Sequence, residues 1–548
     1  MGPLIVQSDR TVLLELDHPD ANAARQTIGG FAELERAPEH VHTYRITRMG
    51  LWNAAAAGVT ADEIISALNT YAKFAVPDTV VRTITDAIDR YGRLDIIRDA
   101  EGRLVLTADD ARLLTDVANH KRVAALLTEQ VDQRTWIVQE WARGQLKQEL
   151  LRIGWPAEDH AGYTDGDPYE IDLNEDDWHL RPYQQQAVDS FVAGGSGVVV
   201  LPCGAGKTIV GAGAMAALSR KTLILVTNTL AAHQWRDELL RRTLLTDEQI
   251  GEYSGEAKII APVTIATYQM LTARRSKKYT HLSLLDAENW GLIVYDEVHL
   301  LPAPIFKLTA ELQARRRLGL TATLVREDGK ESDVFSLIGP KRYEAPWRDI
   351  EAQGFISPAD CVEVRVEFSE DEQARYAMLA DAERYHATAL AEAKLDTVSE
   401  LLDEHADDQT LVIGQYLDQL ELVAERTGLP LITGKTPTPE RERLFAAFRT
   451  GEQRALIVSK VANFSVDLPD ARVAIQISGA FGSRQEEAQR LGRIIRPNSD
   501  GSRSIFYSIV VADTVDQDYA LSRQRFLSEQ GYSYRIVDAE DLPVQIPA

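Results

Sequence analysis

The sequence predicts an α/β fold with mainly parallel sheets, and three observations lead to this prediction. Short runs of apolar, β-branched residues, such as 198–201 and 292–295, are typical of strands buried on both faces. The first run continues through a glycine-rich loop into an alanine-rich helical pattern at 209–218. Further apolar runs recur after residue 352, and 548 residues exceed what one core usually holds, at about 100–200 residues per domain. We therefore expect two α/β units and additional N-terminal domains.

The glycine-rich loop after the first strand has the pattern of a phosphate-binding loop. Gly204 and Gly206 let the backbone turn its N–H groups toward a polyphosphate, while Lys207 and the Thr208 hydroxyl suit the phosphates and Mg²⁺. A full pattern has a further glycine where this chain has Leu201, so an ordinary glycine turn before a helix is the alternative. The strand, loop and helix order favours ATP binding. The expected loop residues are Pro202, Cys203, Gly204, Ala205, Gly206, Lys207 and Thr208.

Two acidic residues follow the apolar run at 292–295. Asp296 lies 296 − 207 = 89 residues after Lys207, which leaves room for intervening strand and helix units. We expect Asp296 to hold Mg²⁺ together with Thr208, and Glu297 to orient and deprotonate the attacking water. The alternative is that these acids only cap a following helix.

With these two motifs in place, the chain resembles the superfamily 2 helicases, with the sequence DEVH at 296–299. Arg181 and Gln184 match an upstream adenine-reading motif, and Thr321 and Thr323 match the motif that couples the lobes. The segment 489–496 matches the family's final motif. The resemblance implies two RecA-like lobes with the nucleotide between them.

The final motif carries a charge argument of its own. Arg493 and Arg496 are three residues apart on an expected helix, so both can face one site, and Gln489 lies one turn earlier. A guanidinium placed at the γ-phosphate stabilises the charge that develops during hydrolysis. A solvated basic helix face is the alternative.

The resemblance narrows to the XPB family of DNA helicases at residues 326–328. Arg326, Glu327 and Asp328 directly follow the Thr321–Thr323 motif, as in that family, and the match continues through 333–343. It implies an ATP- and Mg²⁺-dependent 3′-5′ DNA helicase that serves DNA repair by nucleotide excision, and archaeal relatives suggest a nuclease partner. A double-strand translocase, an RNA-dependent ATPase and a scaffold with a weak motor remain alternatives.

Several polar residues are candidates for DNA contact or for coupling. Thr229, Gln234, Thr267 and Gln269 follow expected strand ends and suit phosphate contacts, although helix capping explains each of them nearly as well. The resemblance adds the loop at 326–328 to the DNA contacts. The expected coupling residues are His299, Thr321, Thr323, Ser459 and Asp467.

Composition limits the partners and the compartment. The formal net charge of −24 is unusual for a DNA-binding protein, so we expect a local basic channel, for which 274–278 and 341–342 are candidates. Two cysteines cannot form a disulfide framework, and no apolar run approaches the ~20 residues of a membrane helix. We expect a cytoplasmic protein, without a membrane partner, that is a monomer or a weak oligomer.

Domain boundaries follow from composition and pattern. Residues 1–117 are expected to hold three helices and a hairpin in winged-helix order, and 118–165 to correspond to the damage-recognition domain of XPB-like proteins. The stretch 156–177 contains nine Asp or Glu and no Lys or Arg, which predicts an acidic linker, placed at 166–178. Lobe 1 is expected at 179–350 and lobe 2 at 351–548, with a helical, thumb-like insertion at about 371–405.

Overall fold

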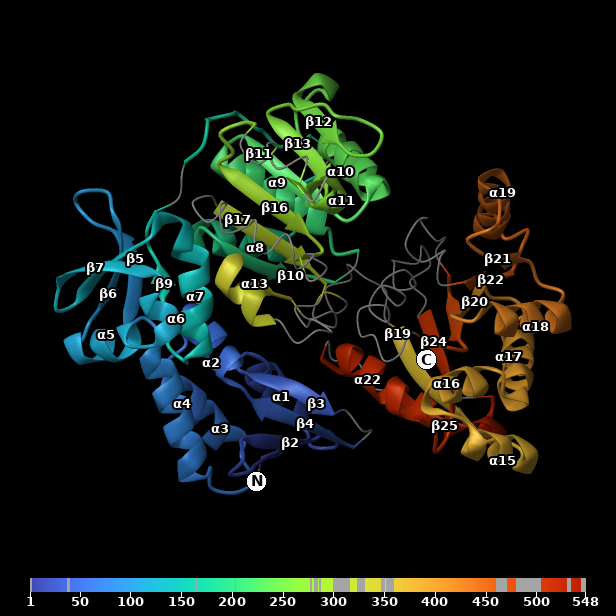
Figure 1. The fold of residues 1–548 in the computed structure, drawn as a ribbon. Coiled ribbons are helices and arrows are strands. Elements are labelled where there is room, and N and C mark those ends of the chain that lie inside the picture. The colour runs from blue at the N-terminus through green and yellow to red at the C-terminus, as the bar shows by residue number, and fades with distance from the viewer. Residues whose placement is uncertain are drawn as a thin grey trace.

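The computed structural model in Figure 1 shows two α/β lobes and two smaller N-terminal units. The N-terminal units are blue and cyan, lobe 1 is green to yellow, and lobe 2 is orange to red. The structure describes residues 2–36, 40–162, 165–176, 178–202, 204–275, 278–279, 284, 287–298, 316–322, 331–345, 350, 359–459, 471–479, 504–529 and 534–543.

The first N-terminal unit packs helices against an antiparallel sheet of order β1-β2-β4-β3. Its strands are β1 (Leu4–Val6), β2 (Thr11–Glu15), β3 (Ala32–Arg36) and β4 (Val41–Ile46). Its helices are α1 (Ala21–Gly29), α2 (Arg48–Ala56), α3 (Ala61–Tyr71) and α4 (Asp78–Arg90). The last three are the helices expected from the apolar periodicity, and their inward faces share one core with the sheet.

The second unit contains the expected hairpin but places it in a different core. The strands β5 (Leu94–Arg98) and β6 (Leu104–Ala108) join a five-stranded sheet of order β7-β8-β6-β5-β9. Its other elements are α5 (Ala111–Ala118), α6 (Lys121–Ala124), β7 (Leu127–Asp132), β8 (Thr135–Val138), η1 (Glu140–Ala142), α7 (Arg143–Arg152) and β9 (Glu158–Asp159). The apolar side chains of the hairpin pack with α5 and α7, not with the three preceding helices. Where the domain boundary falls stays a prediction.

The acidic stretch before the motor is held against its neighbours by ion pairs. The side chain of Asp159 is 6% exposed and lies 2.6 Å from Arg143 and 3.1 Å from Lys147. Farther along, Asp167 lies 2.9 Å from Lys221 of lobe 1, and Ile171 is buried in the core of that lobe. The predicted acidic linker therefore packs on lobe 1, through the ion pair of Asp167 and the buried side chain of Ile171.

Lobe 1 is a seven-stranded parallel sheet of order β12-β13-β11-β16-β17-β10-β18. Its strands are β10 (Gly197–Val200), β11 (Thr222–Val226), β12 (Ile250–Tyr253), β13 (Val263–Thr267), β16 (Leu292–Asp296), β17 (Arg316–Thr321) and β18 (Lys341–Glu344). Its helices are α8 (Pro182–Gly194), α9 (Lys207–Leu218), α10 (Thr229–Arg242), η2 (Asp247–Gln249), α11 (Tyr268–Thr272) and α13 (Glu331–Leu337). A small hairpin, β14 (Arg274–Arg275) and β15 (Lys278–Tyr279), lies apart from this sheet. The central strands are fully buried, as their continuous apolar runs predict.

Lobe 2 repeats the same architecture with the order β21-β22-β20-β23-β24-β19-β25, all parallel. Its strands are β19 (Ala359–Val366), β20 (Thr410–Gly414), β21 (Leu431–Ile432), β22 (Ala455–Ser459), β23 (Val473–Gln476), β24 (Ser504–Val511) and β25 (Tyr534–Asp538). Its helices are α15 (Glu370–Met378), α16 (Asp381–Ala389), α17 (Glu392–Glu404), α18 (Leu417–Thr427), α19 (Thr438–Arg449), α22 (Val515–Glu529) and η5 (Ala539–Asp541). Numbering the strands of each lobe from one to seven along the chain gives the order 3-4-2-5-6-1-7 in both. The predicted fold of two mainly parallel lobes is confirmed.

Candidate functional site

The phosphate loop leaves the C-terminal end of β10 and enters α9. Gly204 and Gly206 both have a φ of 80°, in the left-handed region that glycine tolerates. A Cβ on Gly206 would lie 2.5 Å from Nε2 of Gln184, so a larger residue there would force the Gln184 side chain to shift. Gly206 precedes α9 and offers no side-chain cap, which leaves the first N–H groups of a twelve-residue helix free of capping by that side chain. Such a helix start is suited to an anion.

Residues of the predicted adenine motif support this loop from α8. Gln184 donates from Nε2 to the carbonyl of Ala205 at 2.9 Å, and the Tyr183 hydroxyl donates to the same carbonyl at 2.8 Å. The backbone N–H of Arg181 donates to Oε1 of Gln184 at 2.9 Å. The amide of Gln184 thus fixes the loop in this structure, while its contact with adenine, and that of Arg181, stay predictions.

The loop lysine and the acidic motif meet across the ends of β10 and β16. Nζ of Lys207 lies 2.9 Å from Oε1 of Glu297, and both side chains are largely shielded from solvent, at 12% and 19% exposure. Thr208 is half-buried beside Lys207 in the first turn of α9. The structure therefore brings together three residues that the sequence places at one site.

Asp296 accepts hydrogen bonds from two aromatic residues and is shielded from solvent. Its Oδ2 accepts a hydrogen bond from Nε1 of Trp235 at 2.9 Å, and its carbonyl accepts one from the Tyr268 hydroxyl at 2.7 Å. Burial and the neighbouring charge of Glu297 raise the pKa of Asp296 to about 6, although Lys207 and Trp235 oppose this shift. A carboxylate that loses so much solvation gains strongly from a bound cation.

Trp235 and Tyr268 are site residues that the sequence reasoning missed. Trp235 is buried on α10 with Ala232 and Leu239, at the spacing of a core-facing helix stripe. That spacing predicts burial only, and nothing local to the sequence links the indole to an acid 61 residues later. Tyr268 follows the end of β13 directly, a position from which a polar tip can reach the neighbouring strand ends.

Thr321 lies beside the phosphate loop at the end of β17. Its carbonyl accepts a hydrogen bond from the backbone N–H of Leu201 at 3.0 Å, and the residue is fully buried. The predicted coupling residue is thus in direct contact with the chain that leads into the loop. Ser459, another coupling candidate, ends β22 in lobe 2 and is also buried.

The four predicted DNA contacts of lobe 1 differ in exposure. Gln234 and Gln269 are exposed and Thr229 is half-buried. Thr267 is only 3% exposed at the start of α11, so its side chain has little surface for a phosphate. The remaining predicted site residues lie outside the described residues: Cys203, His299, Thr323, Arg326, Glu327, Asp328, Asp467, Gln489, Arg493 and Arg496.

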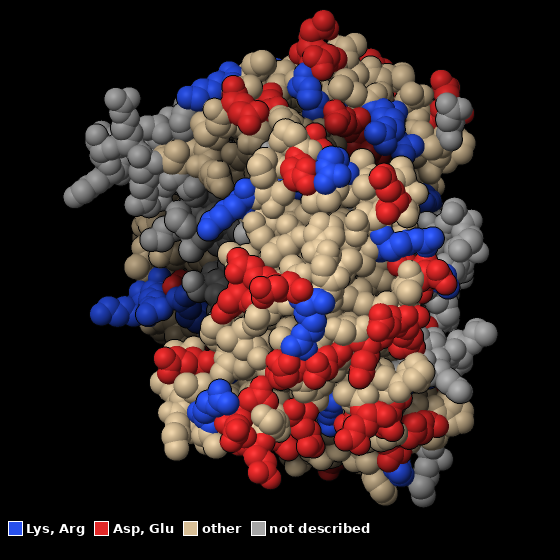
Figure 2. Space-filling view, turned by 90° about the vertical axis from the view of Figure 1, so that its right-hand side faces the viewer, with Lys and Arg blue, Asp and Glu red and all other residues tan. Residues whose placement is uncertain are grey.

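The basic candidate at 341–342 has other contacts, and the thumb-like insertion presents an acidic surface. Arg342 donates from Nε to the carbonyl of Ser196 at 2.9 Å and from Nη2 to that of Gly194 at 3.1 Å, so it joins β18 to the end of α8. The thumb-like helices α15–α17 carry mostly acids on their outer surface, and Figure 2 shows Asp and Glu gathering over the lower half of this side of the molecule. These exposed acids are Glu370, Asp371, Asp381, Glu383, Glu392, Asp396, Glu400, Asp403 and Glu404. Such a face repels phosphate and is better suited to water.

No helix among the described residues is both long and apolar enough to cross a membrane.

Comparison with family models matches three parts of the chain. The ERCC3/RAD25/XPB C-terminal helicase model matches residues 350–545, and a type III restriction enzyme res subunit model matches 177–326. A helicase conserved C-terminal domain model matches residues 4–132 of the N-terminal units. The matches thus cover both lobes and the region before them.

Whole-length relatives agree with these matches. The chain is 60% identical to a DNA 3'-5' helicase XPB of Kineococcus radiotolerans, over 100% of this chain and 98% of the relative. It is 59% identical to a DNA 3'-5' helicase XPB of Mycobacterium tuberculosis, over 99% of this chain and 98% of the relative. A putative DNA 3'-5' helicase Rad25 of Haloarcula marismortui is 36% identical, over 97% of this chain and 83% of the relative.

Proposed function

This chain belongs to the XPB family of DNA helicases, and we propose that it is an ATP-dependent 3′-5′ DNA helicase or translocase that acts in DNA repair, by nucleotide excision. The single observation that carries the proposal is the 2.9 Å pairing of Lys207 with Glu297 at the ends of two central parallel strands. This pairing joins the phosphate loop to the acidic motif at the edge of the sheet where ligands bind in open α/β folds. We also propose that the protein is cytoplasmic and that it binds DNA.

The residues present fit a nucleotide with a divalent metal. Gly206 leaves a cradle that a Cβ would fill, and Asp296 is a buried carboxylate whose pKa is raised to about 6. Asp296 and the Thr208 hydroxyl would hold Mg²⁺, which prefers oxygen ligands. When bound, the ion neutralises charge on the phosphates.

The chain's own groups would then divide the work of hydrolysis. Lys207 is held by Glu297 in this structure, and it would exchange that carboxylate for the phosphates of ATP. Glu297 would then be released to accept the proton of the attacking water. Arg493 and Arg496 would supply positive charge at the γ-phosphate from lobe 2, so that hydrolysis closes and opens the two lobes.

The first test is ATP hydrolysis by the full chain with and without single-stranded DNA. We expect DNA to stimulate hydrolysis and Lys207→Ala to remove it, because the substitution deletes the phosphate-binding charge. Asp237→Asn, which changes an exposed carboxylate on α10 of the same lobe, is the matched control. Absent or DNA-independent hydrolysis by the wild-type chain would contradict the proposal, and stronger stimulation by RNA would redirect it to an RNA-dependent enzyme.

Unwinding and translocation are separated by a second assay on the same protein. Strand separation of a duplex with a 3′ single-stranded tail, but not a 5′ tail, is the expected result for a 3′-5′ helicase. Displacement of a protein roadblock from duplex DNA without strand separation would instead show a double-strand translocase.

A nuclease is the partner that we propose for this helicase, and the chain itself would be a monomer or a weak oligomer. Co-purification of nuclease activity with the tagged full chain at low salt is the expected result, since surface charge pairs weaken as salt rises. A nuclease-free preparation at all salt concentrations would contradict the partner. Light scattering across a concentration series measures the oligomeric state.

A further inference from the structure

The carboxylate of Asp296 is fixed at both of its oxygens. Nε1 of Trp235 donates to Oδ2 at 2.9 Å, and the backbone N–H of Glu297 donates to Oδ1 at 3.1 Å. Glu297 has a φ of 49°, in the left-handed region that is unfavourable for a residue with a Cβ. The backbone thus accepts strain at the residue whose N–H is directed toward this carboxylate.

The indole of Trp235 has little freedom to move. The residue is 2% exposed and lies in the core of lobe 1, where Ala232 and Leu239 of the same helix are also buried. Helix α10 packs on α9, and a Cβ on Gly211 of α9 would lie 2.5 Å from Cη2 and 3.0 Å from Cζ3 of the indole. The absence of a side chain at Gly211 therefore makes room for the ring, and close packing fixes the direction of its N–H.

An indole suits this position chemically. It is a donor only, so it does not compete for a metal ion, and it is neutral, so it does not repel a cation as a lysine or an arginine would. An ionised carboxylate accepts at about four lone-pair sites. The two described hydrogen bonds use one site on each oxygen, so Asp296 keeps a site on both oxygens, in a fixed orientation, for an ion.

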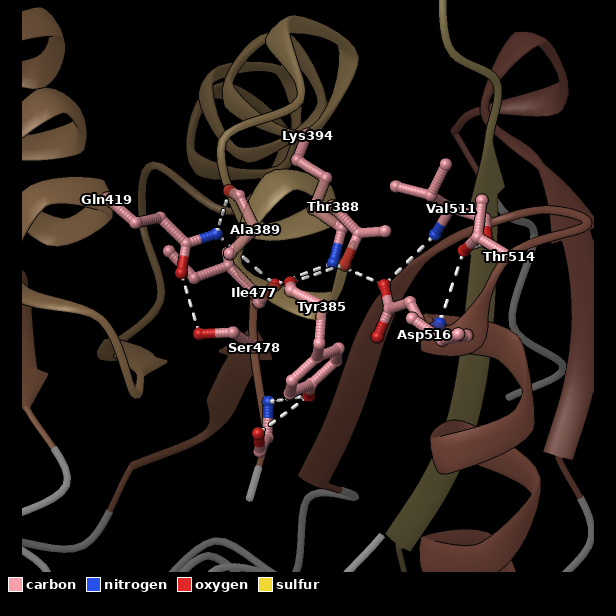
Figure 3. A network of polar contacts seen from close by, with 12 residues as sticks. Tyr385, Thr388, Ala389, Lys394, Gln419, Ile477, Ser478, Val511, Thr514 and Asp516 are labelled. Atoms are coloured by element: carbon pink, nitrogen blue, oxygen red, sulfur yellow. Dashed lines mark hydrogen bonds and ion pairs between the residues drawn. The ribbon is translucent and has the colours of Figure 1, made fainter. Parts of the chain in front are cut away.

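The corresponding strand end of lobe 2 is built differently. β23 is the fifth strand of its lobe, as β16 is of lobe 1, and Figure 3 shows the polar groups at its end from close by. The Ser478 hydroxyl donates to Oε1 of Gln419 at 2.6 Å and accepts from the backbone N–H of Gln415 at 2.8 Å. Nζ of Lys394 donates to the carbonyl of Ile477 at 2.8 Å. These groups satisfy one another, whereas the contacts at the end of β16 orient a carboxylate and leave it able to bind an ion.

We propose that Trp235 is a positioning residue for the divalent metal of the ATP site: it holds the Asp296 carboxylate in the orientation that Mg²⁺ requires and thereby favours Mg²⁺ over larger ions. Mg²⁺ demands a near-ideal octahedral arrangement of its ligands, whereas Ca²⁺ accepts flexible ones. Removing a hydrogen-bond partner of a metal ligand typically lowers metal affinity by about 10–100-fold. This proposal rests on the proposed function, because it needs Asp296 to hold the ion that accompanies ATP.

The test is Trp235→Phe in the full chain, which removes the N–H and keeps an aromatic ring. Binding of a non-hydrolysable ATP analogue is titrated with Mg²⁺ and, separately, with Ca²⁺. We expect the Mg²⁺ concentration for half-maximal binding to rise by about tenfold or more, and that of Ca²⁺ by about threefold or less, because a mobile carboxylate still suits Ca²⁺. Binding of the analogue without metal is expected to stay unchanged, since the phosphate loop and Lys207 are untouched.

The matched control is Trp290→Phe in the same lobe. Trp290 is fully buried and its Nε1 donates to the carbonyl of Leu284 at 3.1 Å, so this change also removes one indole and one hydrogen bond. A wild-type response to both ions in this variant, together with the raised Mg²⁺ requirement of Trp235→Phe, supports the proposal. A second variant, Gly211→Ala, keeps the N–H but places a Cβ against the indole, and we expect it to raise the Mg²⁺ requirement in the same direction.

Three outcomes overturn the proposal. An unchanged Mg²⁺ requirement in Trp235→Phe would show that the indole does not position the carboxylate, while the proposed function would stand. An equal rise for Mg²⁺ and Ca²⁺, or the same rise in Trp290→Phe, would show general damage to lobe 1 in place of a positioning role. Analogue binding by the wild-type chain that responds to neither ion would overturn the proposed function and this proposal together.

Discussion

The two lobes share one strand order but differ at the start of the helix that follows their first strand. In lobe 1 the first strand, β10, leads to Gly206, which enters α9 with a left-handed φ and no side-chain cap. In lobe 2 the first strand, β19, leads to Ser369, which caps α15 in a reciprocal capping box with Glu372. The helix start is left for a ligand in one lobe and satisfied internally in the other.

The ends of the fifth strands differ in the same sense. Asp296 ends β16 and Glu297 follows it; among the described residues Lys207 pairs with Glu297, and burial keeps the pKa of Asp296 high. The end of β23 instead has backbone groups that are satisfied by Tyr385 and Lys394. The same strand order therefore gives a charged strand end that suits a bound ligand in lobe 1. In lobe 2 it gives a strand end whose polar groups are satisfied within the protein.

The largest difference between the lobes is expected from Glu297→Gln and its counterpart Ser478→Ala. Replacing Glu297 removes the proposed base, so kcat should fall by about 100- to 10,000-fold while ATP still binds. Ser478→Ala removes two hydrogen bonds but no proton acceptor, and a loss of no more than about tenfold is expected. Steady-state hydrolysis with saturating DNA measures both variants, and nucleotide binding is measured separately.

Either of two results would break this part of the comparison. Equal losses in the two variants would mean that the end of β23 takes a direct part in the chemistry. A near-normal rate for Glu297→Gln would assign the proton acceptor to another group. As a control, both variants should unfold with the same profile as the wild-type protein, which shows that the lobes remain folded.

A second, smaller effect concerns the stability of lobe 1 without nucleotide or metal. The pKa of Asp296 is raised from 3.8 to about 6 by burial, so the protonated form is favoured in the folded protein. The stability that this shift contributes is complete below about pH 4 and is lost as pH rises through about 6. Asp296→Asn is neutral at every pH and should therefore raise the free energy of unfolding by roughly 1–3 kcal/mol at about pH 8, and by less at about pH 5.

Thermal unfolding of the apo protein at the two pH values measures this difference. Asp237→Asn, which changes an exposed carboxylate on α10, is the matched control and should show no such dependence. The same Asp296→Asn change should abolish hydrolysis, because it removes the proposed metal ligand. An equal increase in the free energy of unfolding at both pH values would show that burial does not disfavour the charged carboxylate of Asp296.

Much of lobe 1 could be predicted because its chemistry is local in sequence. The pattern at Gly204–Thr208 and the acids at 296–297 each follow an apolar strand directly, so position in the sequence predicts position at the sheet edge. Apolar runs after residue 352 also indicated several strands of lobe 2, including β20 and β22, because continuous apolar runs report burial in either lobe. The parallel fold followed from the same patterns.

The contacts that the sequence did not reveal join distant residues of common types. Tyr385 and Arg523 are 138 residues apart, and nothing near either one indicates a shared hydrogen bond. The acidic stretch looked solvated because its partners, such as Lys221, are far along the chain. The hairpin of β5 and β6 formed as expected, but only its packing shows which core it joins. Local pattern predicts elements, whereas partner choice depends on tertiary packing.

The smallest expected effect is that of Ser369→Ala at the start of α15. The Ser369 hydroxyl accepts from the N–H of Glu372 at 3.4 Å, and the Glu372 carboxylate accepts from the N–H of Ser369 at 2.9 Å. Losing the cap should cost about 1 kcal/mol, and Ser369→Gly only a few tenths, because glycine leaves the helix start open to water. Thermal unfolding should rank the wild type as most stable, then Ser369→Gly, then Ser369→Ala. The affinity for ATP should be equal in all three proteins. A change in ATP affinity would mean that the first helix of lobe 2 also serves the nucleotide, and the contrast with Gly206 would then fail.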